Sequence, residues 1–254
     1  MNGIETVFPA LLALGLVAVA VAMSLYQRLD LERDIGVAVV RSFVQLTAIG
    51  YVIDYIFGLE SLGAVVVLLT GMVLFAGWTS ARRVRDVPRA FVVATGAIAV
   101  AAAATLAVLL LLRIVPPTAR YLIPLGGMVI GNSMNAASLT LTSIRDNIAE
   151  QRLKVESALA VGATSRQAVS PILRTALKGA MIPLIDSTKT AGVIFLPGTM
   201  VGMIVGGAAP LEAAKLQLVV LYMLLGSVSI AAILVGLLSY RSFFTPRHQF
   251  RRPP

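Results

Sequence analysis

Long apolar runs recur along the whole chain, and they limit what it can fold into more than any other feature. A helix needs about 20 mostly apolar residues to cross a bilayer, and runs of this length return seven times between short polar connections. Only 13% of the residues are charged and 58% are hydrophobic, whereas soluble domains average about 25% charged residues. The runs lack the period-two alternation of barrel strands. We therefore predict an all-α polytopic membrane protein.

Seven segments are expected to span the membrane as one transmembrane domain that covers residues 1–254. They are residues 6–26, 35–57, 61–80, 90–112, 120–141, 179–206 and 213–240. The sixth is irregular, because Pro183, Pro197 and Gly198 interrupt its apolar pattern. Two interpretations of residues 179–207 stay open: one continuous span, or a broken or re-entrant helix.

The basic residues predict the orientation of these spans, because Lys and Arg are enriched in cytoplasmic loops. Sixteen of the 21 Lys and Arg residues follow the first, third, fifth and last segments, whereas only Arg113, Arg120 and Lys215 lie on the opposite side. The N-terminus is therefore expected outside, and the basic tail at about residues 241–254 inside. Topology explains the net charge of +9 better than binding to nucleic acid does.

The longest polar segment, at about residues 145–178, follows the fifth predicted span and carries six Lys and Arg residues. Residues 147–161 have a helix-forming composition, and Gly162 is placed to end that helix, because glycine adopts the left-handed conformation without a clash. Thr164 is expected to cap a second helix, with a glutamine three residues later completing a capping box. Pro171 should kink or end that helix. A cytoplasmic helix-turn-helix is predicted.

The sequence ESALAVG in this segment resembles the EAA loop of ABC-transporter permeases. That pattern is Glu-Ala-Ala, three residues, Gly, nine residues and Ile-x-Leu-Pro. Glu156, Ala158, Gly162 and Ile172 are in register, whereas Ser157 replaces the first alanine and the Leu-Pro ending is absent. The resemblance implies coupling helices that dock on a cytoplasmic ATPase. An amphipathic surface helix with a glycine cap is the alternative.

Three longer blocks resemble the Fet-type permease family. They are RSFVQLTAIGYVID (41–54), GMVIGNSMNAASLTL (127–141) and AMIPLIDSTKTAGVIFLPGTMVGMIVGGAAPLEAAKLQ (180–217). Bacterial members of that family are described as iron exporters, and plant relatives are linked to aluminium tolerance and nucleotide-sugar transport. The resemblance implies a permease in the cell membrane that exports iron or another metal ion.

The chain itself has no device for hydrolysing ATP. It lacks the G-x-x-x-x-G-K-[ST] loop that cradles phosphates, and His248 is its only histidine and cysteine is absent. No catalytic residue and no bound cofactor is predicted, so the chain is not expected to be an enzyme. ATP is expected on a separate ATPase subunit, in two copies on a permease homodimer that is surrounded by lipid.

Ionisable residues inside a span are costly and therefore candidates for function. Asp186 and Lys189 are three residues apart and can share a helix face, so they are candidates for the translocation path. An equally weighted alternative is a structural ion pair that pins a broken helix near the cytoplasmic interface.

Further path candidates lie on two other segments. Asn132 and Asn135 share one face, although interhelical hydrogen bonding among small residues is the simpler explanation. Arg41 and Gln45 also share a face, and Arg41 is expected to reach the cytoplasmic surface. Thioether sulfur suits soft metals, although methionines more often fill cores. The methionines considered for metal contact are Met128, Met134, Met181, Met200 and Met203.

The sequence thus favours the membrane subunit of an ABC transporter that exports a metal ion. Its alternatives are a permease for an organic substrate such as a nucleotide sugar, an ion-coupled secondary transporter with Asp186 as the coupling carboxylate, and a membrane scaffold without transport.

Overall fold

A computed structural model of the protein describes residues 3–59, 61–84, 86–245 and 249–250. Within these residues the elements are nine α-helices, a short 3-10 helix and two isolated β-bridges, with no strand. The chain divides into two compact units, Met1–Leu59 and Glu60–Pro254.

The first unit consists of helices α1 (Gly3–Gln27) and α2 (Glu32–Leu59). Their connection is fixed by Ser24, which is buried, donates to Glu32 Oε1 over 2.8 Å and accepts from the Leu31 backbone N–H over 3.2 Å. The most apolar stretch of α2 has no buried residue. Its apolar side chains are therefore available to lipid or to another chain.

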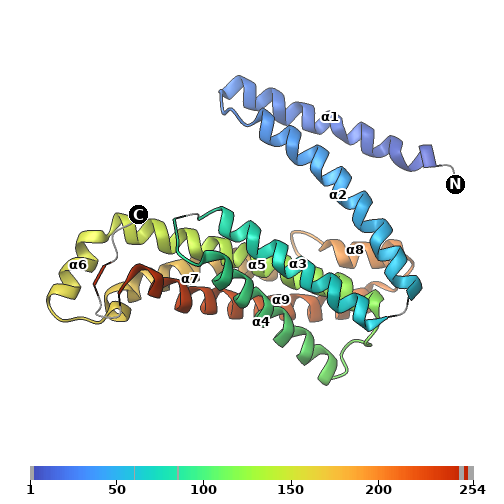
Figure 1. Ribbon diagram of the computed structural model, residues 1–254. Helices are drawn as coiled ribbons and strands as arrows, with labels where there is room; N and C mark the ends of the chain where they lie inside the picture. The colour runs from blue at the N-terminus through green and yellow to red at the C-terminus, as the bar shows by residue number, and fades with distance from the viewer. Residues whose placement is uncertain (1–2, 60, 85, 246–248, 251–254) are drawn as a thin grey trace. The chain divides into compact units, whose positions relative to one another are not determined.

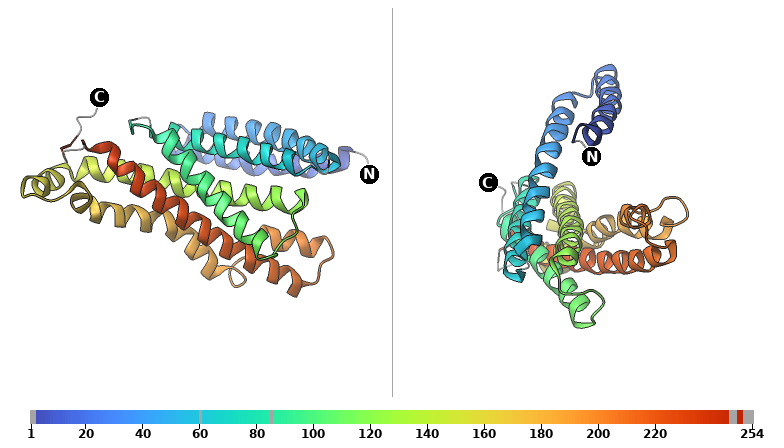
Figure 2. Two further views of the ribbon diagram at one scale, coloured as in Figure 1. Left: turned by 60° about the horizontal axis from the view of Figure 1, so that its bottom comes forward. Right: turned by 90° about the vertical axis from the view of Figure 1, so that its right-hand side faces the viewer.

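The second unit is a bundle of five long helices with a short helix at each end (Figures 1 and 2). The long helices are α3 (Leu62–Arg82), α4 (Ala90–Leu111), α5 (Ala119–Glu150), α7 (Ser165–Thr190) and α9 (Pro210–Ser239). Helix α6 (Arg152–Ala160) lies at one end, and α8 (Gly198–Val205) lies beside α9 at the other. The 3-10 helix η1 (Tyr240–Phe243) follows α9.

Small residues let the helices of the bundle approach closely, as membrane helices commonly do. Ala94, Ala97 and Ala101 of α4 are all fully buried. At the contact of α3 with α4, a Cβ atom on Gly77 would overlap the hydroxyl of Thr95. Glycine at position 77 is therefore required by this packing.

Helices α2, α3, α4, α7 and the joined α9 and η1 are long and apolar enough to cross a membrane. They confirm the predicted polytopic all-α fold. The predicted spans 6–26 and 120–141 are helical in α1 and α5, but within the described residues they do not meet the same criterion of length and composition. Seven spans, and the orientation, therefore stay predictions.

Helix α5 does not stop at the predicted membrane boundary. Its 32 residues extend about 48 Å at 1.5 Å per residue, which exceeds the ~30 Å of a hydrocarbon core. The helix predicted at 147–161 is therefore divided, because residues up to Glu150 continue α5 and the break falls at Gln151, before α6.

The turn after α6 has the predicted chemistry. Gly162 has a φ of +92°, and Thr164 and Gln167 form both bonds of the capping box at the start of α7. Of the two effects predicted for Pro171, an end of the helix is wrong, because α7 continues to Thr190, whereas a kink stays a prediction. Proline costs a helix about 3 kcal/mol, and the buried face of α7, which includes Ile172, offsets that cost.

The irregular segment 179–207 is a broken helix. Its first part belongs to α7, a turn with Gly192 at φ +82° follows Thr190, and α8 begins at Gly198. The predicted interruption at Pro183 is wrong, because α7 continues through it; the helix ends seven residues later.

Candidate functional site

Helix α6 and the turn that follows it lie outside the bundle; these residues, 151–164, are here called the knob. A buried apolar cluster holds it in place. Val155 is 1% exposed and is the buried residue of α6. Its cluster partners from α5, α7 and the C-terminal segment are Ile144, Ile148, Val169, Ile172, Leu173, Ala176, Tyr240 and Phe244. The knob is therefore packed against both α5 and α7, the two helices that carry it.

The outward face of the knob exposes large apolar side chains. Leu153 is 79% exposed and Val161 is 86% exposed. Both precede the candidate span that begins at Ser165. Apolar side chains that lie outside a span are not covered by lipid, so they can bury area against a partner protein. The face of the knob therefore has the character of a docking surface.

A polar chain links the knob to the C-terminal segment. Arg152 Nε donates to Glu156 Oε1 over 2.8 Å, and both side chains are partly exposed. The Arg152 guanidinium also lies 5.4 Å from the ring centroid of Phe250, which packs edge-on against Phe244 at 5.4 Å. No local sequence pattern indicates this contact, because it joins residues that are far apart in the chain.

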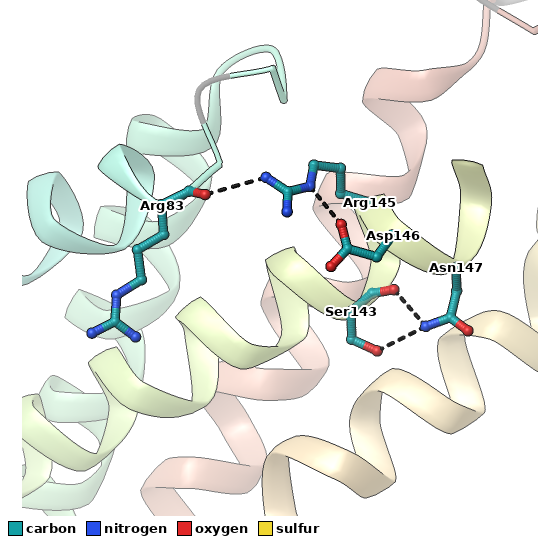
Figure 3. Close-up of polar contacts among 5 residues, drawn as sticks. All are labelled: Arg83, Ser143, Arg145, Asp146 and Asn147. Carbon is teal, nitrogen blue, oxygen red and sulfur yellow. Dashed lines mark hydrogen bonds and ion pairs between the residues drawn. The ribbon is translucent and has the colours of Figure 1, made fainter. Parts of the chain in front are cut away.

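Near the knob, helix α5 is hydrogen-bonded to the end of α3 (Figure 3). Arg145 Nη1 donates over 3.2 Å to the backbone carbonyl of Arg83, which caps the C-terminal end of α3. Arg145 Nε also donates to Asp146 Oδ1 over 2.8 Å. This hydrogen bond to Asp146 raises the pKa of Arg145 above its ordinary value, so the guanidinium stays charged. One turn along α5, Asn147 Nδ2 donates to the Ser143 carbonyl over 2.7 Å.

Three of the four predicted docking residues lie at the surface of the knob. Glu156 and Ala158 are partly exposed on α6, and Gly162 is exposed in the turn. Ile172 is different, because it is 3% exposed and belongs to the buried cluster under Val155. It can support a docking surface from below but cannot contact a partner directly.

Asp186 and Lys189 form the predicted ion pair. Lys189 Nζ lies 3.5 Å from Asp186 Oδ1, with side-chain exposures of 69% and 61%. Asp186 comes 21 residues after the start of α7 at Ser165, which is about 30 Å along the helix. The pair therefore lies at the end of α7 opposite the knob, and its position relative to the cytoplasmic interface stays a prediction.

The two asparagines do not join helices. Asn132 Nδ2 donates to the Met128 carbonyl within α5 over 2.8 Å, and Asn135 is exposed. A serine pair links α3 and α5 instead, since Ser138 Oγ donates to Ser80 Oγ over 3.0 Å. Serines inside apolar helices were the available signal for this bond.

The remaining candidates are dispersed. Arg41 and Gln45 line the same shallow groove on α2, in the first unit. Met128 Sδ accepts a long 4.0 Å contact from Thr199 Oγ1, which links α5 to α8. Met128 and Met134 pack against the main core, and Met181 packs against a smaller cluster. The described residues contain no group of three or more His, Cys, Asp or Glu side chains placed to hold a metal.

Comparison with known proteins gives one consistent result. Residues 7–244 match the model of a family described as uncharacterised protein family UPF0014. The chain is 44% identical over 237 residues to the UPF0014 membrane protein STAR2 of Oryza sativa subsp. japonica, covering 93% of this chain and 83% of that protein. It is 43% identical over 239 residues to the protein ALUMINUM SENSITIVE 3 of Arabidopsis thaliana, covering 94% and 88%.

A bacterial relative is similar over the same length. The chain is 36% identical over 238 residues to the probable iron export permease protein FetB of Escherichia coli K12, covering 94% of this chain and 92% of that protein. No solved structure matches the chain.

Proposed function

The chain belongs to the UPF0014 family of multi-pass membrane proteins, and from that premise we propose that it is the permease subunit of an ABC transporter that exports iron or another metal ion. Its energy comes from a separate ATPase subunit, which binds ATP and docks on the knob within the segment 145–178. Two permease chains and two ATPase copies form the transporter. The observation that carries this proposal is the knob, a helix and turn that pack on α5 and α7 and expose Leu153 and Val161 outside the bundle.

Docking would use the exposed side of the knob. Leu153 and Val161 supply apolar area, and the Glu156 carboxylate supplies a charge for a basic group on the ATPase. Interfaces of this kind combine a buried apolar centre with a polar rim. A partner can reach Leu153 and Val161 only where no lipid covers them. Both residues precede the candidate span at Ser165, which agrees with this requirement.

Coupling would follow from the way in which the knob is mounted. Helices α5 and α7 run without interruption from the knob into the bundle, over 32 and 26 residues. The cluster around Val155 joins both helices to α6. Close-packed elements move together as rigid bodies, so displacement of the knob by the ATPase would move both α5 and α7. Movement of α7 also moves Asp186 at its other end.

The proposal that the cargo is a metal ion rests on the relatives and not on a metal site in this chain. FetB is named a probable iron export permease, and the two plant relatives match nearly as much of their lengths. The Asp186 and Lys189 pair, which lies in a candidate span, is the first place to look for a translocation path. An organic cargo is the alternative.

Co-purification with the ATPase tests the docking step. Glu156→Lys and Gly162→Pro should each abolish association with the co-expressed ATPase. Glu212→Lys is the matched control, because Glu212 forms a comparable exposed ion pair with Lys215, 2.7 Å apart, at the start of α9. Intact association of both knob variants would reject the docking site. Metal analysis of a deletion strain tests the cargo, because unchanged metal content under iron load would favour an organic substrate.

A secondary transporter driven by Asp186 is the second candidate. It rests on the same carboxylate, which Lys189 partly neutralises. Transport that persists without the ATPase would support this candidate over the first.

A further inference from the structure

A groove of about 470 Å³ follows the exposed side of α7, with α9 as its other wall. The half nearer the knob is basic, since Arg166, Arg174 and Lys178 line it and are exposed. The half nearer α8 is apolar and includes Ile182 and Ile185. One groove therefore combines a cationic end with an apolar end.

The three basic residues share one face of α7, because they are separated by eight and four residues. Within the described part of the chain, none of Arg166, Arg174 and Lys178 forms an ion pair with a carboxylate. Like charges on one helix face repel each other. A bound anion would relieve that repulsion.

The position of the groove in α7 indicates which anion fits. Leu237, the residue of α9 that lines this groove, comes six residues before the end of the candidate span Pro210–Phe243, which is about 9 Å along the helix, and its neighbour Gly236 faces Leu177. The basic half of the groove therefore lies near that membrane surface, and its apolar half lies deeper. Lys178 and Ile185 are about 10 Å apart along the helix, within the ~15 Å of one leaflet. A phospholipid has this order of groups, whereas a soluble protein cannot follow the apolar half into the bilayer. Basic pockets between membrane helices are known to bind anionic headgroups.

A second groove repeats the arrangement on another face of α9. Its volume is about 390 Å³, and it lies between the start of α4 and the end of α9. Arg89 and Arg241 are its basic residues, and Val92 and Leu238 are among its apolar ones. Neither arginine has a carboxylate partner in the described residues. Leu237 lines the first groove and Leu238 the second, so the two lie at the same level of α9.

We propose that the groove between α7 and α9 is a binding site for an anionic phospholipid. Arg174 and Lys178 hold the phosphate, Arg166 adds charge above it, and one acyl chain follows Ile182 and Ile185. The second groove binds a further lipid in the same way. The bound lipid fills the space beside the base of α7, the helix that carries the knob. This site does not depend on the transported cargo or on the ATPase.

Native mass spectrometry of the intact protein, purified in a nonionic detergent, tests the proposal. The probes are phosphatidylglycerol and phosphatidylcholine with identical acyl chains. The unchanged protein should bind phosphatidylglycerol at least about tenfold more tightly, a difference of about 1.4 kcal/mol. Arg174→Gln with Lys178→Gln should reduce the number of preferentially bound phosphatidylglycerol molecules from two to one per chain, because the second groove keeps Arg89 and Arg241. Arg174→Lys with Lys178→Arg should retain both, which separates loss of charge from loss of fold.

The matched control is Arg82→Gln with Arg83→Gln, which removes the same charge outside both grooves and should leave the preference unchanged. Equal binding of the two lipids by the unchanged protein would overturn the proposal. Two preferentially bound phosphatidylglycerol molecules per chain after loss of Arg174 and Lys178, or an equal loss in the control, would overturn it too. Glu156→Lys should keep lipid binding while losing the ATPase, so failure here and failure of the docking proposal are distinguishable.

Discussion

Arg152 Nε donates to Glu156 Oε1 over 2.8 Å, one turn along the exposed side of α6. The only acidic residue of the knob face that matches the EAA pattern is thus held by a neighbour on its own helix. In the docking proposal an ATPase has to meet this pair and not an isolated carboxylate. The pair can therefore be varied without disturbing the buried cluster beneath it.

Exchange of the two residues separates folding from docking. In Arg152→Glu with Glu156→Arg the ion pair is kept, and an exposed i,i+4 pair contributes only about 0.3–0.5 kcal/mol. Loss of the Arg152 contact with Phe250 should cost no more than about 1 kcal/mol in thermal unfolding in detergent, whereas association with the ATPase should fall at least about tenfold, or 1.4 kcal/mol. Retained association would show that the position of the carboxylate is unimportant.

Gly162→Ala should lower the stability of the knob, although the space around position 162 admits a methyl group. A Cβ atom there meets nothing within 4 Å, but φ is +92°, and a left-handed conformation costs a residue with a side chain about 1–2 kcal/mol. Amide hydrogen exchange of α6 should become faster by a corresponding factor. Gly179→Ala is the control, because it is helical and also meets nothing within 4 Å. Equal exchange rates in the two variants would contradict the need for glycine in the turn at position 162.

Gly77→Ala should destabilise the bundle for the opposite reason. The added Cβ atom would overlap Thr95 where α3 meets α4, and overpacking of a core typically costs about 1–3 kcal/mol. Gly71→Ala, also in α3 with nothing within 4 Å, should be neutral or slightly stabilising. Thermal unfolding of the two variants measures the difference. Equal unfolding temperatures of the two variants would contradict the close approach of Gly77 to Thr95 between α3 and α4.

Asp186→Asn should reduce transport more than Asp186→Asn together with Lys189→Gln. The single change leaves a lysine without its partner at 3.5 Å, and an isolated charge in a span costs up to about 3 kcal/mol, less near the membrane edge. The double change removes both charges. Transport by both variants can be compared in reconstituted vesicles. Equal damage would argue for a direct role of Asp186 with the cargo.

Local sequence chemistry predicted the parts of the fold that depend on neighbouring residues. The apolar runs identified the helices, Gly162 identified the turn after α6, and Thr164 identified the capping box. The Asp186 and Lys189 pair was predicted because it lies within one helix. Each of these features is determined by residues within a few positions of one another.

Features that depend on tertiary packing were missed or predicted wrongly. Pro171 does not end α7, because buried neighbours on the other face of that helix hold it in place. The break at Gln151 was not predicted, since no glycine or proline marks it. The contact of Phe250 with Arg152 joins the C-terminal segment to α6, and nothing in either segment alone indicates it.

The central claim is that the knob contacts an ATPase, and site-specific cross-linking tests it most directly. The chain has no cysteine, so Leu153→Cys provides a single thiol on the knob, and Val193→Cys provides one in the exposed turn after α7 at the other end of the bundle. With a thiol-directed photo-cross-linker in membranes, Leu153→Cys should form a covalent product with the ATPase and Val193→Cys should not. A product from Val193→Cys alone, or none from Leu153→Cys while ATP-driven transport persists, would contradict the account.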